Sequence, residues 1–543
     1  MMRNKVFFLK LRSNVVLNGD IDLAEREVRA FFKQIERVSQ PAQIEKKTGL
    51  PAALSRLHDK GGDCIGFIAR GADLTIREMV LLLNFVQEIW FEERQNGAYD
   101  EFRQEQWFSL IEHKGKGFIC LLPLMACGEL LSQAKMPSPK TEDIGLLTAF
   151  LSGSTKAGKK IKAPTTGSTS TQHVHSMHKY KAKFFPRLIR SFLVEYLNKI
   201  PKNSNGKVTL LDPFVGSGTS LVEASLLGLD SAGVDIDKLS CAISQAKIDA
   251  LTVSPGRVEE TAQRLLDMAA DIEVDKPTYK FPQLIAKKFE RWGSIEEQLS
   301  YERAISKWKC AIDQIDNERL RHLFEICLSD ALTRKFVIRM MGTGVGRFAL
   351  EIAKTSLDTL MSSNFKVLAH SIRVARSLID GYGIRLGNAT ISHGTAVKLP
   401  FDDDIFSVVI TSPPYLPASS GREDYLIGKA VSNVALDLMT DTEIEETEAA
   451  SVGSMKWAVA HGDGLPASVY ELHDWLVRDP LREIKAKPIL AYYLSLKQAL
   501  KETFRVLLPG GYAFYVVGKE SVFYRFSTRE VLYRVECDKI FAA

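Results

Sequence analysis

The stretch that decides the fold is "KVTLLDPFVGSGTSLVEASLLGLDSAGVDID", Lys207 to Asp237. Its apolar start predicts a buried strand ending at Asp212, and Gly216 and Gly218 predict a tight turn before a helix. Glycines let the backbone approach a ligand closely, and the start of a helix presents free amides. Asp235 ends the next predicted strand, where an acid can accept both hydroxyls of a ribose. This order of strand, turn, helix, strand and acid predicts a βαβ unit that binds a nucleoside-containing ligand.

A second predicted strand end lies in "VVITSPPYLP", Val408 to Pro417. In a doubly wound sheet, ligands lie beyond the carboxyl ends of the strands, near the point where the strand order reverses. Pro413 and Pro414 fix their φ angles and offer carbonyls without amides, so they predict a rigid row of acceptors beside Ser412. An exocyclic amine needs its two hydrogens held by acceptors if its lone pair is to face an electrophile. Tyr415 adds a flat face on which a base can stack.

Together these motifs resemble those of the amino-methylating DNA methyltransferases, which use S-adenosylmethionine. "DPFVGSGT" followed by "TSPPY" carries the resemblance, and the "SPPY" form is most typical of enzymes that act on N4 of cytosine. "HKYKAKFFPRLIRSFL" resembles the cofactor-closing motif, "GTAVKLPFDDDIFSVVI" the strand and loop that usually read "GDA…LP", and "FRVLLPGGYAFYVVG" a late strand. The resemblance implies an α/β fold, namely a Rossmann-like class I methyltransferase sheet with a helical insertion and a small N-terminal α+β domain.

The resemblance also implies a role for each residue of these motifs. The acid usual in "GDA" is replaced by Thr395, which puts recognition of the adenine edge by a carboxylate at that position in doubt. The implied catalytic residues, which would hold the target base, are Ser412, Pro413, Pro414 and Tyr415. The implied cofactor-binding residues are Lys183, Phe184, Pro186, Asp212, Pro213, Phe214, Gly216, Ser217, Gly218, Thr219, Asp235, Ile236 and Thr395.

The implied reaction is direct in-line transfer of a methyl group to a base flipped out of double-stranded DNA. No covalent intermediate is needed, and no cysteine stands in a Pro-Cys turn of the kind that cytosine-C5 enzymes use. The resemblance requires no metal. It also implies a place in a restriction-modification or related defence system, where a restriction endonuclease could be the partner.

A chain of 543 residues is too long for one hydrophobic core, so several domains are expected. The composition changes to Gly, Ser, Thr and Lys between the first α+β segment and the glycine turn, which is typical of a linker. The predicted regions are an N-terminal α+β accessory domain (1–150), a flexible linker (151–176), the cofactor-binding half of the methyltransferase (177–250), a helical insertion that could contact DNA (251–380) and the catalytic half (381–543).

Composition excludes several other classes of protein. The net charge of +5 permits a nucleic-acid partner without requiring one. Seven scattered cysteines with no CxxC pair argue against a disulfide framework or a thiolate zinc site. No apolar run reaches the roughly 18 residues that span a bilayer, and the charged start does not resemble a secretory signal. We therefore predict a cytoplasmic protein without a membrane partner.

Two weaker patterns are given structural interpretations. His173, His175 and His178 have no carboxylate or cysteine at ligand spacing, so no metal site is predicted. The glycine-rich "GTGVG" that begins at Gly342 looks like a nucleotide loop, but no acid precedes it. Because its surroundings look helical, it is interpreted as a turn between helices.

The residues that would read DNA are less defined. Two groups are candidates: basic residues of the insertion that could contact phosphates, and residues after the catalytic turn that could line a flipped-base pocket. Solvated helix faces explain these charges equally well. The first group comprises Arg334, Lys335, Arg339 and Arg347, and the second comprises Arg422 and Tyr425.

Three other functions remain open from the sequence. An adenine-N6 DNA methyltransferase would use the same turn. A guanine-N2 methyltransferase of tRNA has similar glycine turns, although such enzymes typically carry "DPPY" where this chain has "SPPY". A regulatory subunit that binds the cofactor without turnover is the third, because Thr395 departs from the family pattern.

Overall fold

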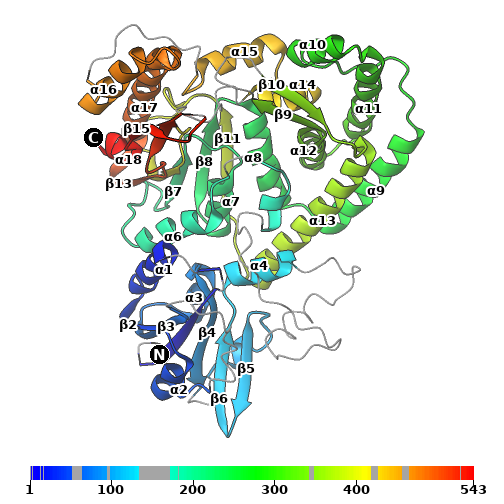
Figure 1. The fold of residues 1–543 in the computed structure, drawn as a ribbon. Coiled ribbons are helices and arrows are strands. Elements are labelled where there is room, and N and C mark those ends of the chain that lie inside the picture. The colour runs from blue at the N-terminus through cyan, green and yellow to red at the C-terminus, as the bar shows by residue number, and fades with distance from the viewer. Residues whose placement is uncertain are drawn as a thin grey trace.

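The computed structural model describes the whole chain except residues 1, 3, 13, 16–17, 52–63, 94–97, 134–171, 181–182, 341–347, 417–425, 455–463 and 526. Within the described residues, a six-stranded sheet occupies one end of the molecule and a five-stranded sheet its centre (Figure 1). Helices of the middle of the chain lie on one side of the central sheet and C-terminal helices on the other. None of the helices in this described part is long and apolar enough to cross a membrane.

The central sheet forms from short runs of buried aliphatic residues. Leu210 and Val408 pack on one face and Leu211 and Val409 on the other, because successive side chains of a strand point to opposite faces. All pairings are parallel, which confirms the predicted α/β architecture. In spatial order the strands are β11 (Ala389–His393), β8 (Asp230–Asp235), β7 (Thr209–Asp212), β12 (Phe406–Thr411) and β13 (Leu507–Tyr515).

The strand order reverses direction next to β7. From β7 the chain moves outward to β8 and β11, then returns to the other side of β7 to form β12 and β13. Val408 and Val409 of β12 pair with Leu210 and Leu211 of β7, so the ends of these two strands lie side by side. This is a topological switch point, where ligands of open parallel sheets bind beyond the carboxyl ends of the strands.

Helices cover both faces of the central sheet. Ile189 and Leu193 of α6 (Pro186–Tyr196) and Ala224 of α7 (Thr219–Leu226) pack with Leu210 on one face. Val506, at the end of α17 (Ala486–Val506), packs on the other face with Leu211. The helix after β8, α8 (Lys238–Ala250), joins the sheet to the helical region.

The helical region between β8 and β11 also contains a β-hairpin. Its helices are α9 (Pro255–Asp271), α10 (Gln283–Trp292), α11 (Ile295–Asp313), α12 (Glu318–Lys335) and α13 (Leu357–Gly381). The hairpin consists of β9 (Phe336–Met340) and β10 (Phe348–Ile352), antiparallel to each other. The segment with Gly342, Gly344 and Gly346 was predicted to be a turn between helices. This prediction is wrong, because the elements before and after the segment are strands. The glycines themselves lie outside the described residues. Residues 336–339 and 348–351 alternate buried and less buried positions, as paired strands do.

The N-terminal region is an antiparallel α+β unit that shares its core with the central region. Val194 of α6 and Leu378 of α13 belong to the same buried cluster as Phe7 and Trp90. The predicted domain boundary at residue 150 lies outside the described residues and stays a prediction. In spatial order the strands are β2 (Phe32–Val38), β3 (Gly66–Ala72), β1 (Val6–Leu11), β4 (Val86–Glu93), β6 (Lys116–Leu121) and β5 (Phe108–His113). The helices are α1 (Asn18–Arg29), α2 (Pro41–Thr48), α3 (Ile76–Leu82), η1 (Asp100–Phe102) and α4 (Leu124–Gln133).

The predicted linker over 151–176 is wrong at its C-terminal end. Residues 151–171 lie outside the described part, but η3 (His173–Ser176) is a short helix in which Val174 and His175 are fully buried. Val174 packs in the core of the helical region and His175 is hydrogen-bonded to Glu223. Composition alone suggested a solvated segment, whereas these tertiary contacts bury it.

The C-terminal part of the chain adds short elements, some of which lie near the carboxyl ends of the strands of the central sheet. In Figure 1, α15 crosses the end of the molecule opposite the N-terminal sheet. The remaining elements are η4 (Ile427–Lys429), α14 (Ala430–Ala435), α15 (Asp441–Ala450), α16 (Ala467–Val477), η5 (Glu483–Lys485), β14 (Ser521–Tyr524), β15 (Val531–Val535) and α18 (Cys537–Ala542).

Candidate active site

Asp212, the last residue of β7, ties three elements together. Its Oδ1 accepts hydrogen bonds from the Thr411 hydroxyl of β12 at 2.6 Å and from the Phe214 amide at 3.1 Å. Its Oδ2 accepts a hydrogen bond from Ser220 of α7. Burial raises the pKa of Asp212 to about 6, although these hydrogen bonds oppose the shift. The carboxylate therefore fixes the end of β12 and the start of α7 relative to β7.

The glycine turn after β7 requires glycine at Gly216 and Gly218. Both have positive φ angles, of 52° and 71°, and a Cβ at Gly218 would lie 2.9 Å from the Cα of Ser244. Two residues of α8 hold the turn from behind. The Ser244 hydroxyl donates to the Gly216 carbonyl at 3.1 Å, and the buried Lys247 ammonium donates to the Ser217 carbonyl at 2.6 Å.

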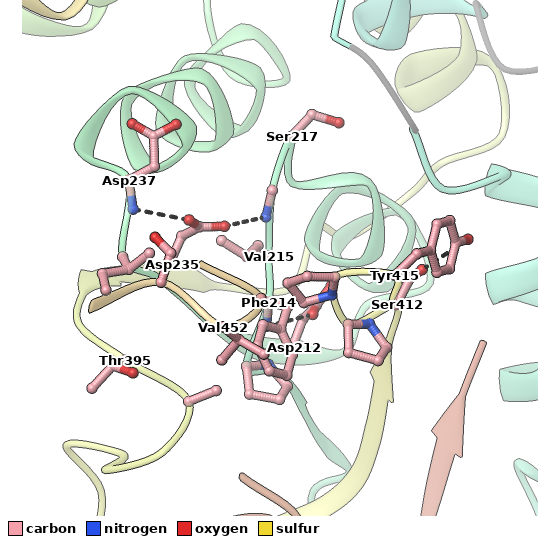
Figure 2. Close-up of a pocket in the computed structure, with 18 of the residues that line it drawn as sticks. Asp212, Phe214, Val215, Ser217, Asp235, Asp237, Thr395, Ser412, Tyr415 and Val452 are labelled. Atoms are coloured by element: carbon pink, nitrogen blue, oxygen red, sulfur yellow. Dashed lines mark hydrogen bonds between the residues drawn. The ribbon is translucent and has the colours of Figure 1, made fainter. Parts of the chain in front are cut away.

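Asp235, at the end of β8, faces the glycine turn (Figure 2). Its two carboxylate oxygens accept the backbone amides of Gly216 at 2.8 Å and Asp237 at 3.0 Å. A carboxylate has about four acceptor positions, so each oxygen keeps one for a ligand. Burial, together with the neighbouring Asp237 carboxylate, raises the pKa of Asp235 to about 6.

The turn after β12 presents acceptors in a fixed arrangement. The Ser412 hydroxyl lies 3.1 Å from the Val516 carbonyl, to which it can donate, and 3.4 Å from the Tyr415 hydroxyl. The Pro414 carbonyl accepts from the Tyr492 hydroxyl of α17 at 2.9 Å, and this contact holds the proline pair against a buried helix. Tyr415 is 45% exposed, so its ring is open to a stacking partner.

One cavity of about 240 Å³ joins the glycine turn, Asp235 and the turn after β12. In Figure 2, Ser412 and Tyr415 lie at one end of it, and Thr395 and Asp237 at the other. The cavity opens at the ends of β7 and β12, the switch point of the sheet. A nucleoside-containing ligand bound by the glycine turn would thus lie beside a turn that can hold an amine.

Three curated proteins are similar to this chain in sequence. M.MjaII, a Type II methyltransferase from Methanocaldococcus jannaschii, is 29% identical over 154 residues, which are 28% of this chain and 27% of the relative. M.MvaI, a Type II methyltransferase from Kocuria varians, is 27% identical over 374 residues, which are 65% of this chain and 79% of the relative. M.BsoBI, a Type II methyltransferase from Geobacillus stearothermophilus, is 38% identical over 69 residues, or 13% and 12% of the two chains.

The chain is similar in sequence to three Type II methyltransferases. This relationship confirms the resemblance to DNA methyltransferases that the two turns predict. The chain spans about a quarter of M.MjaII and about four fifths of M.MvaI. No protein-family model matches it. Among solved structures, the rRNA methyltransferase aviRa from Streptomyces viridochromogenes aligns with 46% of this chain and 64% of its own, at 15% identity and a TM-score of 0.20, which supports no argument.

Most residues predicted for the methyltransferase site line the cavity. They are Phe184, Asp212, Pro213, Phe214, Gly216, Ser217, Thr219, Asp235, Ile236, Thr395, Ser412, Pro413, Pro414 and Tyr415. Three predicted residues do not line it. Gly218 packs against α8, and Pro186 is buried as the first residue of α6. Lys183 turns toward η3, where its ammonium donates to the His175 carbonyl at 2.6 Å.

One wall of the cavity was not predicted from the sequence. Residues 426–454, called the covering segment below, contribute Leu426, Glu448 and 451–454 to the lining. No motif marks this segment, because its residues reach the cavity only through the path of the chain after the catalytic turn. Tyr180 and Asp237 were also missed, although both stand within quoted motifs, three positions before Lys183 and two positions after Asp235 respectively.

The histidines of η3 do have a carboxylate neighbour. Ligand atoms of His173, His175 and Glu223 lie within 4.8 Å of one another, so the premise that no carboxylate is near was wrong. Glu223 lies 48 positions away in the sequence, and only the fold brings it close. His175 Nε2 lies 2.7 Å from one oxygen of Glu223, and the Arg190 guanidinium pairs with the other at 3.3 Å. Because Glu223 is already paired with the Arg190 guanidinium, these residues are better interpreted as a buried hydrogen-bond network than as a metal site.

The basic residues proposed to contact DNA phosphates have partners within the protein. Arg334 pairs with Asp330 at 2.7 Å and Arg339 with Glu351 at 2.9 Å. Lys335 donates to backbone carbonyls on the chain after β10. Arg347, Arg422 and Tyr425 lie outside the described residues, so a DNA-contacting role for either group stays a prediction.

Proposed function

We propose that the protein is a site-specific DNA methyltransferase that transfers a methyl group from S-adenosylmethionine to N4 of cytosine, on a Rossmann-like class I sheet. One observation carries the proposal. Asp212, which ends the strand before the glycine turn, is hydrogen-bonded to Thr411, the residue directly before Ser412. The turn suited to the cofactor and the turn suited to the amine therefore open into one cavity. The similarity to Type II methyltransferases supports the proposal.

The cavity fits S-adenosylmethionine. The ligand carries an ammonium, a ribose diol and a sulfonium cation, all of which favour carboxylates nearby. Asp212 and the glycine turn would hold the methionine part, and the free acceptor positions of Asp235 would hold the ribose. A Cβ at Gly216 would lie 3.4 Å from the Tyr180 hydroxyl, so glycine keeps this part of the cavity open. When bound, the sulfonium supplies an electrophilic methyl group.

The residues of the catalytic turn position the accepting amine. With its hydrogen donated to the Val516 carbonyl, Ser412 would accept a hydrogen bond from the amine in place of its 3.4 Å contact with the Tyr415 hydroxyl. The Pro413 carbonyl would accept the second amine hydrogen, and the contact of Tyr492 with the Pro414 carbonyl supports a fixed turn. With both hydrogens held, the nitrogen lone pair is directed out of the base plane, and Tyr415 supports the flipped base by stacking.

Ser412 favours cytosine as the target. The "SPPY" form resembles that of cytosine-N4 enzymes, and a neutral serine at the first position of the turn distinguishes it from "DPPY" turns. Adenine N6 has the same two hydrogens and is the alternative DNA target. The Type II designation of the relatives supports a role in restriction-modification, with a restriction endonuclease as the expected partner. A DNA substrate also agrees with the predicted cytoplasmic location.

Transfer of a labelled methyl group tests this function. The purified protein is incubated with methyl-labelled S-adenosylmethionine and either genomic DNA or tRNA. We expect label in DNA, and we expect Ser412→Ala to lower the initial rate roughly 10- to 100-fold, as for loss of one critical hydrogen bond. Ser204→Ala is the matched control, because Ser204 is exposed in a distant turn.

Each other outcome contradicts the proposal in a defined way. Label in tRNA but not in DNA would identify an RNA methyltransferase. Cofactor binding without label in either nucleic acid would identify a regulatory subunit. Equal rates of methyl transfer for wild type and Ser412→Ala would show that the Ser412 hydroxyl does not take part in the reaction.

A further inference from the structure

Three distant segments of the chain meet at Lys429 of η4. Its ammonium donates to the Asp237 carboxylate at 2.6 Å, to the Ser240 hydroxyl at 3.0 Å and to the Tyr180 hydroxyl at 3.2 Å. The ammonium also lies 4.5 Å from the centre of the Tyr180 ring, within the range of a cation–π contact. Lys429 thus joins the covering segment to the segment before α6 and to the chain after β8.

The contacts of Lys429 are sheltered from water. The Lys429 and Asp237 side chains are 14% and 3% exposed, whereas Lys238 and Glu443, a second pair between α8 and the covering segment, are 33% and 43% exposed. Exposed ion pairs contribute little because water and salt screen them. A sheltered pair is screened less, so losing its cation leaves a buried carboxylate without its counter-charge.

Two of the three partners of Lys429, Tyr180 and Asp237, line the cavity on the side proposed for the cofactor. Tyr180 lies over the glycine turn, next to Gly216. Asp237 donates its backbone amide to Asp235, the predicted ribose acceptor. Lys429 itself belongs to the covering segment, whose far end also lines the cavity. Leu426 and Glu448, near the two ends of this segment, are hydrogen-bonded to each other at 3.0 Å.

We propose that Lys429 is a positioning residue that couples binding of S-adenosylmethionine to the placement of the covering segment over the cavity. This role rests on the proposed function. The ammonium holds Tyr180 above the glycine turn and balances the two carboxylates at the end of β8. A bound cofactor that contacts Asp235 and the glycine turn would therefore favour the docked position of the covering segment.

The charge of Lys429 also affects the ionisation of Asp235. The ionisable groups that act on Asp235 and its surroundings are Asp212, Asp237, Cys241 and Lys429. Burial and Asp237 raise the pKa of Asp235, and Lys429 opposes them. Burial also acts against the charged form of Asp237, but Lys429 and the hydrogen bonds outweigh it and lower the pKa of Asp237. Removing the ammonium should raise the pKa of Asp235 further.

Calorimetric binding of S-adenosylmethionine across a pH series tests the proposal. We expect Lys429→Met to weaken binding at neutral pH at least about tenfold and to move the midpoint of its pH dependence upward. Lys429→Arg should keep the wild-type midpoint because it keeps the charge. Tyr180→Phe should weaken binding without moving the midpoint. Lys238→Met, which removes the exposed pair, is the matched control and should change the affinity less than about twofold.

The outcomes separate this role from the proposed function. If wild type binds S-adenosylmethionine and folded Lys429→Met binds it with the same affinity and midpoint, Lys429 has no positioning role and the proposed function stands. If Lys429→Met does not fold, an unchanged affinity of Tyr180→Phe overturns the role instead. If wild type itself binds no S-adenosylmethionine, the proposed function fails and the role of Lys429 fails with it.

Discussion

The orientation of the Asp212 carboxylate at the end of β7 depends on a residue distant in the sequence. The sequence predicts that an acid ends β7, because an apolar run stops there before a glycine turn. Its carboxylate, however, is held by Thr411, which lies 199 positions further along the chain. Lys183 is a second case, because its ammonium bonds to the His175 carbonyl instead of facing the cavity. Local patterns place such residues near a site, but tertiary partners decide where their polar atoms point.

We expect the proposed role of Asp235 to give cofactor binding an unusual pH dependence. With a pKa of about 6, it gains a proton as the pH falls through that value, whereas an ordinary aspartate stays charged down to about pH 4. Affinity for S-adenosylmethionine, measured between about pH 8 and pH 5, should therefore fall near pH 6. Asp212 has a similar pKa and should act in the same direction.

Asp235→Asn should weaken cofactor binding about 10- to 100-fold at neutral pH, since a charged acceptor is lost. It should also flatten the dependence of binding on pH. Asp230→Asn is the control, because Asp230 lies at the opposite end of β8 and pairs with Lys207 on the surface. An affinity for Asp235→Asn equal to that of wild type would exclude Asp235 from the cofactor site.

At the scale of elements, the βαβ unit could be predicted because its constraints are local. The apolar runs, the glycines with positive φ and the following helix all lie within about 30 residues, as such units require. The hairpin β9–β10 was missed because its short strands lie between long helices. The covering segment was missed for a different reason. Its lining residues acquire their role from the route of the chain over the sheet, which no local pattern encodes.

Gly218→Ala tests whether the close packing of the glycine turn on α8 matters for binding. A Cβ at Gly218 would meet the backbone of Ser244, which cannot move without shifting α8. We expect cofactor affinity to fall at least about tenfold and the free energy of unfolding to fall by more than the strain of a positive φ alone.

Gly206→Ala is the matched control for this substitution. Gly206 has a φ of 73°, and a Cβ there meets nothing within 4 Å. It should cost only the conformational strain, about 1–2 kcal/mol in denaturant unfolding, and leave cofactor binding unchanged. Equal effects of the two substitutions on binding would show that the packing of the turn is not needed.

At the scale of the whole molecule, a buried polar network joins the N-terminal region to the helix after the glycine turn. Glu27 of α1 accepts hydrogen bonds from Asn84, whose side-chain oxygen accepts one from Arg190 of α6 at 2.7 Å. Arg190 pairs with Glu223 of α7, which is also bonded to His175. The sequence predicts the regions but not this network, because its members are spread from residue 27 to residue 223.

Arg190→Met should destabilise the protein strongly. It leaves Glu223 buried without its cation, which typically costs about 3–5 kcal/mol of unfolding free energy. Arg26→Met is the matched control. Arg26 of α1 also pairs with a residue of α6, Glu195, but its side chain is 52% exposed, so a loss of only about 0–1 kcal/mol is expected in urea unfolding.

A second substitution that removes the charge of Glu223 tests why Arg190→Met destabilises the protein. Glu223→Gln combined with Arg190→Met should recover part of the lost stability, because residue 223 then carries no unpaired buried charge. Equal stabilities of Arg190→Met and Arg26→Met would show that the buried network does not link the two regions energetically.

Nucleoside analysis of DNA from cells that express the intact protein tests the central claim most directly. The DNA is digested and its modified bases are identified by mass spectrometry, with cells that express Ser412→Ala as the comparison. We predict N4-methylcytosine in the first sample and its loss in the second, since we propose that Ser412 holds the amine that is methylated. N6-methyladenine alone would contradict cytosine as the target. N4-methylcytosine at the same level in both samples would contradict the role of the Ser412–Tyr415 turn.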